Sequence, residues 1–146
     1  TSEAAGLAEL TVFLGEAGIP AGDVLLQEGS GLSRACLVKP GATVALLKHM
    51  RAHPSAAEFR NSLPVAGVDG TLRNRFKGSA AEGNLQAKTG TLRYVHTLSG
   101  YVDAADGEPL AFSIMLNNFR HPDSNASARA ELDRIAVMLA EMGKPE

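Results

Sequence analysis

The chain has 146 residues, of which 45% are hydrophobic and 5% aromatic, and this composition suits one ordinary globular domain with an aliphatic core. Its 14 basic and 16 acidic residues give a net charge of -2, so no long-range positive field favours nucleic acid or an anionic membrane. The one cysteine, Cys36, excludes an internal disulfide, and no apolar run reaches the roughly 18 residues that span a bilayer. We therefore predict no nucleic-acid partner and no transmembrane segment.

The chain starts at Thr1 without Met and without a basic segment that leads into an apolar one, so we expect a processed product or a fragment. A first helix is predicted from a cap at Ser2 to about Ala17. Its apolar residues recur at helical spacing and are expected to pack inward: Leu7, Leu10, Phe13 and Leu14. A short apolar run over 24–27 then predicts a strand that leads into a glycine-rich loop ending near Arg34.

Two further helical pieces follow. Pro40 suits the first turn of a helix over about 41–52, and Pro54 opens a shorter piece that ends near Ser62. Residues 63–70 contain too many glycines and prolines for a regular element, and we expect them to cross the surface or to skirt a cleft.

From residue 85 the pattern becomes that of strands. Runs over 85–91, about 94–103 and about 109–118 predict three strands, and the turn 104–107, with its Asp-Gly, makes the last two an antiparallel hairpin. Residues 110–116 are almost continuously apolar, which is typical of a strand covered on both faces.

A final amphipathic helix is predicted from a cap at Asp123 or Ser124 to about Met142. Its inward stripe is expected to consist of Leu132, Ile135, Ala136 and Leu139.

The first predicted strand ends in the sequence Lys-Thr-Gly-Thr, residues 88–91. A fixed cation such as Lys88 attracts a carboxylate and can hold a neighbouring hydroxyl in a proton path. Threonine hydroxyls donate oriented hydrogen bonds to carboxylate oxygens, and Gly90 allows close approach of facing backbone. An edge strand can also bind an extended peptide, and its N–H groups can serve as oxyanion donors. Taken alone, the sequence equally fits a solvent-facing Lys-Thr pair before a glycine bulge.

Two other patterns have a structural explanation beside a functional one. The loop over 29–34 combines glycines, hydroxyls and the Arg34 guanidinium, which suits either a polar ligand or a simple turn in which Arg34 is a local cap. His49 and His53 stand one helical turn apart, but no third ligand accompanies them. We therefore predict no metal site, and no pattern indicates a cofactor.

Three segments stand in order along the chain: Glu-Gly-Ser-Gly-Leu-Ser-Arg at 28–34, Leu-Pro-Val-Ala-Gly-Val-Asp-Gly-Thr-Leu at 63–72, and Ala-Lys-Thr-Gly-Thr-Leu at 87–92. Together they resemble the C-terminal part of the D-alanyl-D-alanine carboxypeptidase/endopeptidase family, the low-molecular-mass class C penicillin-binding proteins of peptidase family S13. Lys-Thr-Gly is one of three signatures of such serine enzymes and of class A β-lactamases. The other two, Ser-x-x-Lys and Ser-Asp-Asn or Ser-x-Asn, do not occur in these 146 residues.

The resemblance implies the C-terminal portion of a transpeptidase-like α/β domain, in which an antiparallel sheet is flanked by helices. Residues 1–146 are then one segment of that domain. It also implies an exported enzyme of the periplasm or cell envelope, which hydrolyses D-Ala-D-Ala and related cross-links of peptidoglycan through an acyl-enzyme and is acylated by β-lactam antibiotics. The expected partners are a peptidoglycan stem peptide, β-lactams and the N-terminal portion of the same protein, without which this chain is expected to be inactive.

The same resemblance implies two groups of site residues. Lys88 lies beside the nucleophile, and the backbone N–H of Thr91 belongs to the oxyanion hole. Thr89 and Thr91, with Gly90 between them, bind the terminal carboxylate of the substrate. A second group, the wall near the substrate's side chain, consists of Ser30, Leu32 and Arg34.

The sequence departs from the family pattern at Glu28, where Asp is usual, and at Cys36, where Asn is common. One alternative function is a non-catalytic cell-wall-binding or structural module derived from the same fold. A class A β-lactamase is a further alternative, although no segment resembles the loop that carries its deacylating glutamate.

Overall fold

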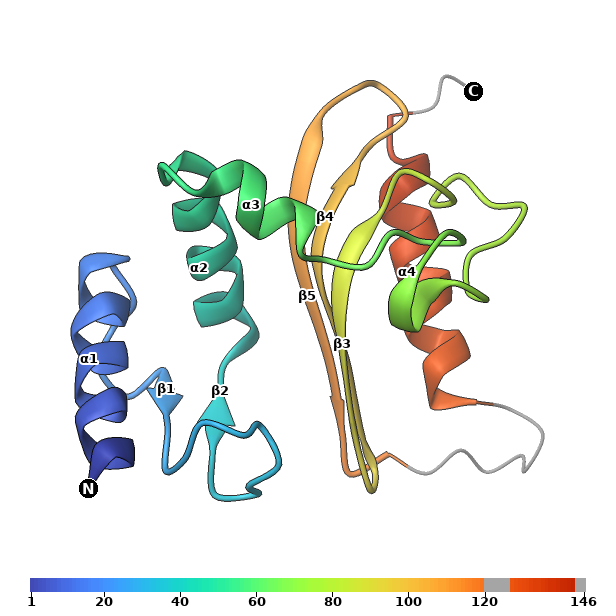
Figure 1. The fold of residues 1–146 in the computed structure, drawn as a ribbon. Coiled ribbons are helices and arrows are strands. Elements are labelled where there is room, and N and C mark those ends of the chain that lie inside the picture. Colours follow the sequence, from blue (N-terminus) through green and yellow to red (C-terminus); the bar gives the residue numbers. More distant parts are fainter. Residues whose placement is uncertain (120–126, 144–146) are drawn as a thin grey trace. The chain divides into compact units, whose positions relative to one another are not determined.

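The computed structural model describes residues 1–119 and 127–143, and Figure 1 shows its helices and strands. The chain divides into two compact units, Thr1–His53 and Pro54–Glu146, and each is described by itself. The division falls at Pro54, because a proline ring disfavours helical geometry in the residue before it. Accordingly, His53 ends the preceding helix in an extended conformation, with φ -75° and ψ 151°.

The first unit contains two helices and a two-stranded ribbon. Its elements are α1 (Ser2–Glu16), β1 (Val24–Leu25), β2 (Leu37–Val38) and α2 (Pro40–Ala52). The predicted cap at Ser2 is wrong by one residue, because the Thr1 side chain accepts the Ala4 N–H at 3.4 Å and Ser2 is already helical. The buried hydrophobic residues of this unit are Ile19, Ala42 and Leu47.

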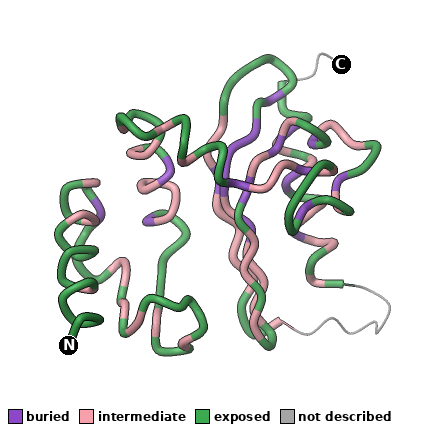
Figure 2. Tube along the Cα trace, in the orientation of Figure 1, coloured by how far each residue is buried: buried purple, intermediate pink, exposed green. Residues whose placement is uncertain are grey.

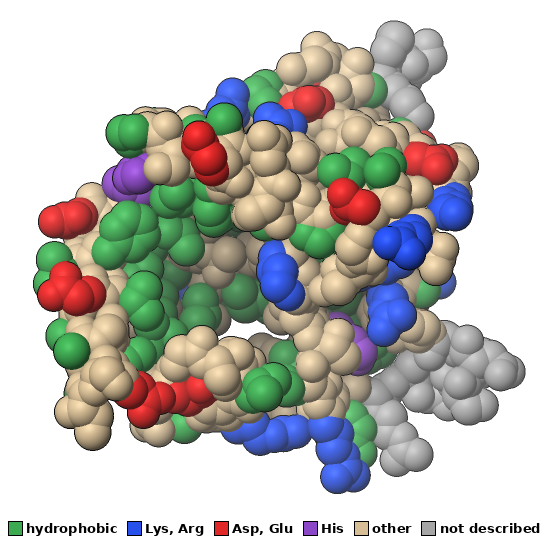
Figure 3. All heavy atoms as spheres, viewed as in Figure 1, with side chains coloured by type: hydrophobic (Ala, Val, Ile, Leu, Met, Phe, Trp, Pro, Cys, Tyr) green, Lys and Arg blue, Asp and Glu red, His purple; other side chains and the backbone are tan. Residues whose placement is uncertain are grey.

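The predicted inward stripe of α1 is not buried in this structure. No residue of α1 is buried, and Leu10 is 43% exposed. Hydrophobic side chains gather over α1 and α2 on the face drawn in Figure 3. The first unit therefore leaves apolar surface uncovered by its own residues.

The glycine-rich loop is closed by strand pairing. Val24 pairs with Val38 and Leu25 with Leu37, in antiparallel register. The predicted strand over 24–27 is thus confirmed in a shorter form, whereas its partner β2 was not predicted. Directly after β2, Pro40 begins α2 in the first-turn position that the sequence indicates.

The second unit is built on a three-stranded antiparallel sheet in the order β3-β4-β5. The three predicted strands and the terminal helix are confirmed within one or two residues, except at the start of that helix. The elements are α3 (Ala56–Asn61), the short 3-10 helix η1 (Gly70–Leu72), β3 (Gln86–Leu92), β4 (Val95–Asp103), β5 (Pro109–Asn117) and α4 (Ala128–Glu141).

One face of the sheet packs on α4 and forms the core of the second unit, where the buried residues concentrate in Figure 2. The register sets which side chains reach this face, because directly paired residues lie on the same side. Ala87, Gly100 and Phe112 form one row across the three strands, and Leu98 with Ile114 belongs to the next. The helix meets these rows with small and aliphatic side chains, namely Leu132, Ala136 and Ala140.

The N-terminus of α4 differs from the prediction. Ser127 is its N-cap, and the Ser127 hydroxyl accepts the Arg129 N–H at 3.2 Å. Asp123 and Ser124, the predicted caps, lie outside the described residues.

The buried stripe of α4 is shifted slightly from the predicted one. Leu132 and Ala136 are buried as expected, but Ile135 is 45% exposed and Ala140 takes its place in the core. Residues four apart in a helix lie on one face, so 132, 136 and 140 form a straight row from which Ile135 deviates. Small residues in that row let the helix approach the sheet closely.

The prediction that residues 110–116 are covered on both faces is wrong for this chain. Only Phe112 of β5 is buried, while Leu110, Ile114 and Leu116 are partly buried on the α4 side. β5 is an edge strand here, and its other face carries half-exposed side chains. Within residues 1–119 and 127–143, no helix combines the length and the apolar character required to cross a bilayer.

Candidate functional site

The Lys-Thr-Gly-Thr sequence lies on β3, which is an edge strand of the sheet. The start of its outer edge is covered, because the Ala87 N–H donates to the Pro64 carbonyl at 3.0 Å. Backbone groups alternate sides along a strand, so Thr89 and Thr91 direct their N–H and C=O groups to the same outer side. No strand of the described residues pairs with them there. The structure thus leaves a short stretch of backbone open for hydrogen bonding.

The side chains of this sequence leave the strand on both faces. Lys88 pairs with Ser99, whereas Thr89 pairs with Leu98 and therefore lies on the face that packs against α4. The Lys88 ammonium nevertheless reaches the outer edge, because Nζ donates to the Thr89 carbonyl at 2.7 Å. A positive charge and the open N–H groups of Thr89 and Thr91 are consequently gathered along one edge.

Two threonines outside β3, Thr71 and Thr97, lie against this edge strand. Thr89 Oγ1 donates to Thr71 Oγ1 at 3.1 Å, which links β3 to η1. Gly90 faces Thr97 of β4, and a Cβ atom at position 90 would overlap Thr97 Oγ1. The glycine is therefore required by a facing side chain, and not by the facing backbone that was expected from the sequence.

A row of polar side chains crosses the sheet face opposite α4. Lys88, Ser99 and Ser113 pair in register across the three strands, and the two serine hydroxyls are 2.9 Å apart. Neither this row nor a role for Thr71 was predicted from the sequence. Thr71 lies within the second of the three resembling segments, so its position was flagged, but its contact with Thr89 was not.

The glycine-rich loop of the first unit is organised around one carboxylate. Glu28 accepts the Ser30 N–H at 2.6 Å and the Ser33 N–H at 2.9 Å. The Ser30 side chain, followed by the N–H groups of Ser33, Ser30 and Leu32, lowers the pKa of Glu28, against a smaller opposing effect of desolvation. A carboxylate that accepts several N–H groups fixes the loop backbone. The side chains that this loop presents to solvent include Leu32, which is 69% exposed.

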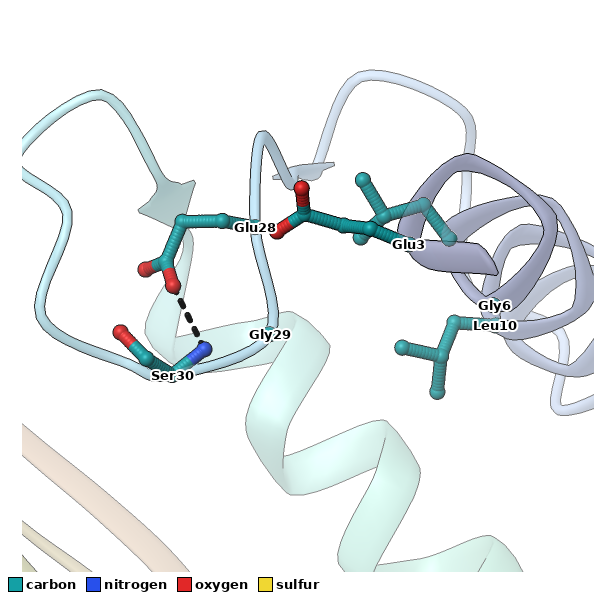
Figure 4. A pocket seen from close by; sticks show the side chains of 7 residues that line it. Glu3, Gly6, Leu10, Glu28, Gly29 and Ser30 are labelled. Carbon is teal, nitrogen blue, oxygen red and sulfur yellow. Dashed lines mark hydrogen bonds between the residues drawn. The ribbon is translucent and has the colours of Figure 1, made fainter. Parts of the chain in front are cut away.

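Figure 4 shows Glu28 turned toward Ser30 on one side of an open cavity and Glu3 and Leu10 of α1 on the other. The cavity has a volume of about 570 Å³. Its lining belongs to α1 and to the start of the loop: Glu3, Gly6, Leu7, Leu10, Glu28, Gly29 and Ser30.

The structure thus gathers the predicted site residues in two places. Lys88, Thr89 and Thr91 lie together at the outer edge of β3 in the second unit. Ser30, Leu32 and Arg34 lie in the loop of the first unit, and all three are exposed.

The chain matches a known protein family and several of its members. The D-Ala-D-Ala carboxypeptidase 3 (S13) family matches residues 1–141. D-alanyl-D-alanine carboxypeptidase of Actinomadura sp. (strain R39) is 45% identical over 142 residues, which cover 94% of this chain and 26% of that protein. D-alanyl-D-alanine carboxypeptidase DacB of Haemophilus influenzae is 33% identical over 119 residues, covering 80% of this chain and 25% of that protein. The chain spans about a quarter of the length of these curated relatives.

The solved structures show the same fold. Penicillin binding protein 4 (dacB) from Haemophilus influenzae superposes with a TM-score of 0.80 at 31% identity, covering 93% of this chain and 32% of that chain. The same protein complexed with a β-lactam gives a TM-score of 0.78 at 32% identity, covering 92% of this chain and 32% of that chain. The predicted fold, part of a penicillin-binding protein with an antiparallel sheet flanked by helices, is confirmed. By its sequence and its fold, the chain belongs to the S13 family of D-Ala-D-Ala carboxypeptidases.

Proposed function

We propose that this chain supplies the substrate-binding wall of a serine D,D-carboxypeptidase/endopeptidase. The enzyme hydrolyses D-Ala-D-Ala and related cross-links of peptidoglycan through an acyl-enzyme, and β-lactams acylate it. Its nucleophile belongs to a Ser-x-x-Lys motif, which does not occur in these 146 residues. An N-terminal portion therefore supplies that motif and Ser-x-Asn, and residues 1–146 alone are inactive.

The observation that carries this proposal is the open edge of β3, where a cation and unpaired backbone donors meet. An extended peptide can add to such an edge as a further strand, using the N–H and C=O groups of Thr89 and Thr91. Its terminal carboxylate is then within reach of the Lys88 ammonium and the threonine hydroxyls. A carboxylate is a stronger acceptor than the Thr89 carbonyl that Lys88 contacts now, so ligand binding draws the ammonium away from it.

Two residues of this edge take part in the chemistry in our proposal. The Lys88 charge stabilises the deprotonated form of a hydroxyl that approaches from the N-terminal portion. The Thr91 N–H points outward from the strand and donates to the oxyanion that forms when the nucleophile attacks. A single donor of this kind is worth about 10²–10³ in rate. Thr89 and Thr91, with Gly90 between them, hold the carboxylate end of the substrate.

The loop of the first unit supplies the wall near the substrate's side chain. Glu28 holds this loop in a fixed shape, and Ser30, Leu32 and Arg34 are exposed on it. Exposed apolar and cationic side chains on one loop suit a stem-peptide residue with an aliphatic stem and an acidic end. Because peptidoglycan lies outside the cytoplasm, we propose that the enzyme is exported to the periplasm or cell envelope.

The β-lactam complex of the Haemophilus influenzae protein supports the ligand class. A fluorescent penicillin tests the proposal directly when residues 1–146 and the N-terminal portion are supplied as two polypeptides; together these two form the assembled enzyme. We expect covalent fluorescence only when both are present, and we expect it on the N-terminal polypeptide. Circular dichroism of each polypeptide checks that both are folded before mixing.

Fluorescence bound covalently to the isolated chain of residues 1–146 would contradict this division of roles. If the assembled enzyme binds purified peptidoglycan but neither hydrolyses it nor becomes labelled, the alternative of a non-catalytic wall-binding module is supported instead.

A further inference from the structure

We propose that Thr71 is a positioning residue for Thr89 and holds the Thr89 hydroxyl toward the acidic end of the ligand. This inference rests on the function proposed above, and it adds a residue that the three signature motifs do not contain. The starting observation is the Oγ1–Oγ1 distance of 3.1 Å between Thr71 and Thr89, across 18 residues of sequence.

The loop that carries Thr71 is fastened on both sides of it. Ala66 and Leu72 are fully buried, with 0% exposure, so the loop is anchored in the core of the second unit. The Gly67 N–H donates to the Leu72 carbonyl at 3.0 Å, and the Val65 N–H donates to Asp69 Oδ1 at 2.8 Å. These bonds close the loop on itself, and a closed, anchored loop holds an exposed side chain in a defined place.

The same loop is attached to the strand that carries Thr89. Gly70 has a φ of +49°, and a Cβ added to it would lie 3.0 Å from Pro64 Cγ, so the turn before Thr71 packs tightly on Pro64. The Pro64 carbonyl accepts the Ala87 N–H of β3 at 3.0 Å. Gly70, Pro64 and Ala87 therefore connect the turn before Thr71 to β3. Thr89 lies two residues after Ala87 on the same outer edge of that strand.

A threonine hydroxyl has one hydrogen and two acceptor positions, and the hydrogen rotates to suit its partners. In the structure, Thr89 donates to Thr71. When a carboxylate arrives, Thr89 turns its hydrogen to the stronger acceptor, and the Thr71 hydroxyl then donates to Thr89 Oγ1. When Thr71 donates to Thr89 and Thr89 donates to the carboxylate, the chain of hydroxyls polarises the Thr89 O–H bond toward the carboxylate. Without Thr71, the Thr89 hydroxyl loses this support and its preferred rotamer.

Substitution of Thr71 in the assembled enzyme tests this role. Thr71→Val keeps the shape of the side chain but removes both the donor and the acceptor. We expect it to lower the second-order rate constant for acylation by a peptide ending in D-Ala-D-Ala about tenfold. Thr71→Ser keeps the hydroxyl and is expected to stay within about twofold of the parent. Thr11→Val, the same change at an exposed threonine of α1 whose hydroxyl donates to the Leu7 carbonyl, is the matched control.

A second substrate separates positioning from a structural effect. A peptide that ends in a carboxamide lacks the carboxylate that Thr89 is proposed to bind, so it should acylate the enzyme more slowly. We expect Thr71→Val to change the second-order rate constant for this peptide by no more than about twofold. An equal loss on both substrates, or no loss on the acidic one, overturns the inference. Thr89→Val and Lys88→Ala are measured in parallel. If they impair acylation and Thr71→Val does not, the inference fails while the proposed function stands; if none of the three has an effect, the proposed function fails.

Discussion

Arg75 and Asp133 form an ion pair that ties the segment ahead of β3 to α4. Arg75 Nε lies 3.1 Å from Oδ1 and 3.3 Å from Oδ2 of Asp133, and Nη2 also bonds Oδ1. The Arg75 side chain is only 11% exposed, and its guanidinium lies 5.3 Å from the ring centroid of Phe76. The pair is thus part of the packing that holds the loop of Thr71 against the core.

Arg75→Ala should lower the free energy of unfolding by about 2–3 kcal/mol, because it leaves the Asp133 carboxylate partly buried without its partner and removes packing on Phe76. The matched control is Arg134→Ala, since Arg134 pairs with Glu131 on the same helix but is 70% exposed. We expect that variant to cost less than about 1 kcal/mol. Denaturant unfolding of the assembled enzyme measures both, and equal losses would contradict the role assigned to the Arg75–Asp133 pair.

Gly90→Ala should destabilise the hairpin of β3 and β4, because the new Cβ overlaps Thr97 Oγ1. Thr97→Ala removes that oxygen and leaves only the Cβ of residue 97, which is 3.7 Å from the added atom. The double variant should therefore recover part of the loss, with a coupling free energy of about 1–2 kcal/mol in a double-mutant cycle. Strictly additive effects on the free energy of unfolding would show that this overlap is not the cause.

Gly100→Ala should be more damaging than Gly90→Ala. A Cβ at position 100 would overlap the Gln86 carbonyl oxygen and lie 2.6 Å from Ala87 Cα, and these backbone atoms cannot rotate away. β3 would have to separate from β4, so we expect a loss of more than about 3 kcal/mol or failure to fold. The comparison is made by unfolding midpoints and soluble yield of the two variants; a Gly100→Ala protein as stable as Gly90→Ala would refute this interpretation.

Lys88→Ala should reduce acylation of the assembled enzyme by fluorescent penicillin by on the order of 10²-fold or more, because it removes the only charge at the open edge that the proposed mechanism uses. Lys88→Arg should restore only part of the rate, since a planar guanidinium does not replace a compact ammonium at a fixed point. Lys88 is exposed, so both variants should unfold at nearly the parent denaturant concentration. Normal acylation rates in Lys88→Ala would remove Lys88 from the mechanism.

The stability of the loop conformation over 28–34 should depend on pH, because the Glu28 carboxylate holds the loop. Its pKa in the folded chain is lowered, first by the Ser30 side chain, so the ionised form stabilises the loop. That stabilisation is complete above the pKa that Glu28 has in the unfolded chain, and it is lost as the pH falls through the lower folded pKa. We expect the amide resonances of Ser30 and Ser33 to titrate together below the ordinary glutamate range. Glu28→Gln should abolish this titration, and a transition at the ordinary glutamate pKa would speak against the lowered value.

Local patterns predicted most of the second unit. Strand alternation over 85–118 and the Asp106-Gly107 turn depend on neighbours in sequence, and the structure confirms them. The errors concern burial, which depends on residues that are distant in the sequence. Whether Ile135 or Ala140 faces the core depends on how closely α4 approaches the sheet, and whether β5 is covered on its second face depends on which elements pack against that face.

The candidate site shows the same limit. The residue types at 88–91 indicated an anion-binding edge, and alternation along a strand already puts Lys88 and Thr89 on opposite faces. Two contacts could not be predicted: the hydrogen bond from the Lys88 ammonium to the Thr89 carbonyl, and the contact between Thr71 and Thr89. Each depends on three-dimensional proximity that the periodicity of the sequence does not encode.

The contact between Lys88 Nζ and the Thr89 carbonyl also bears on self-association. A free sheet edge invites pairing with an identical edge of another molecule, and lysine side chains at such edges oppose it. Here the ammonium occupies one of the acceptors that an incoming strand needs, so a second copy must displace a charge before it can pair. The residue proposed to receive the acid of a ligand therefore also disfavours ordered aggregation of the ligand-free protein.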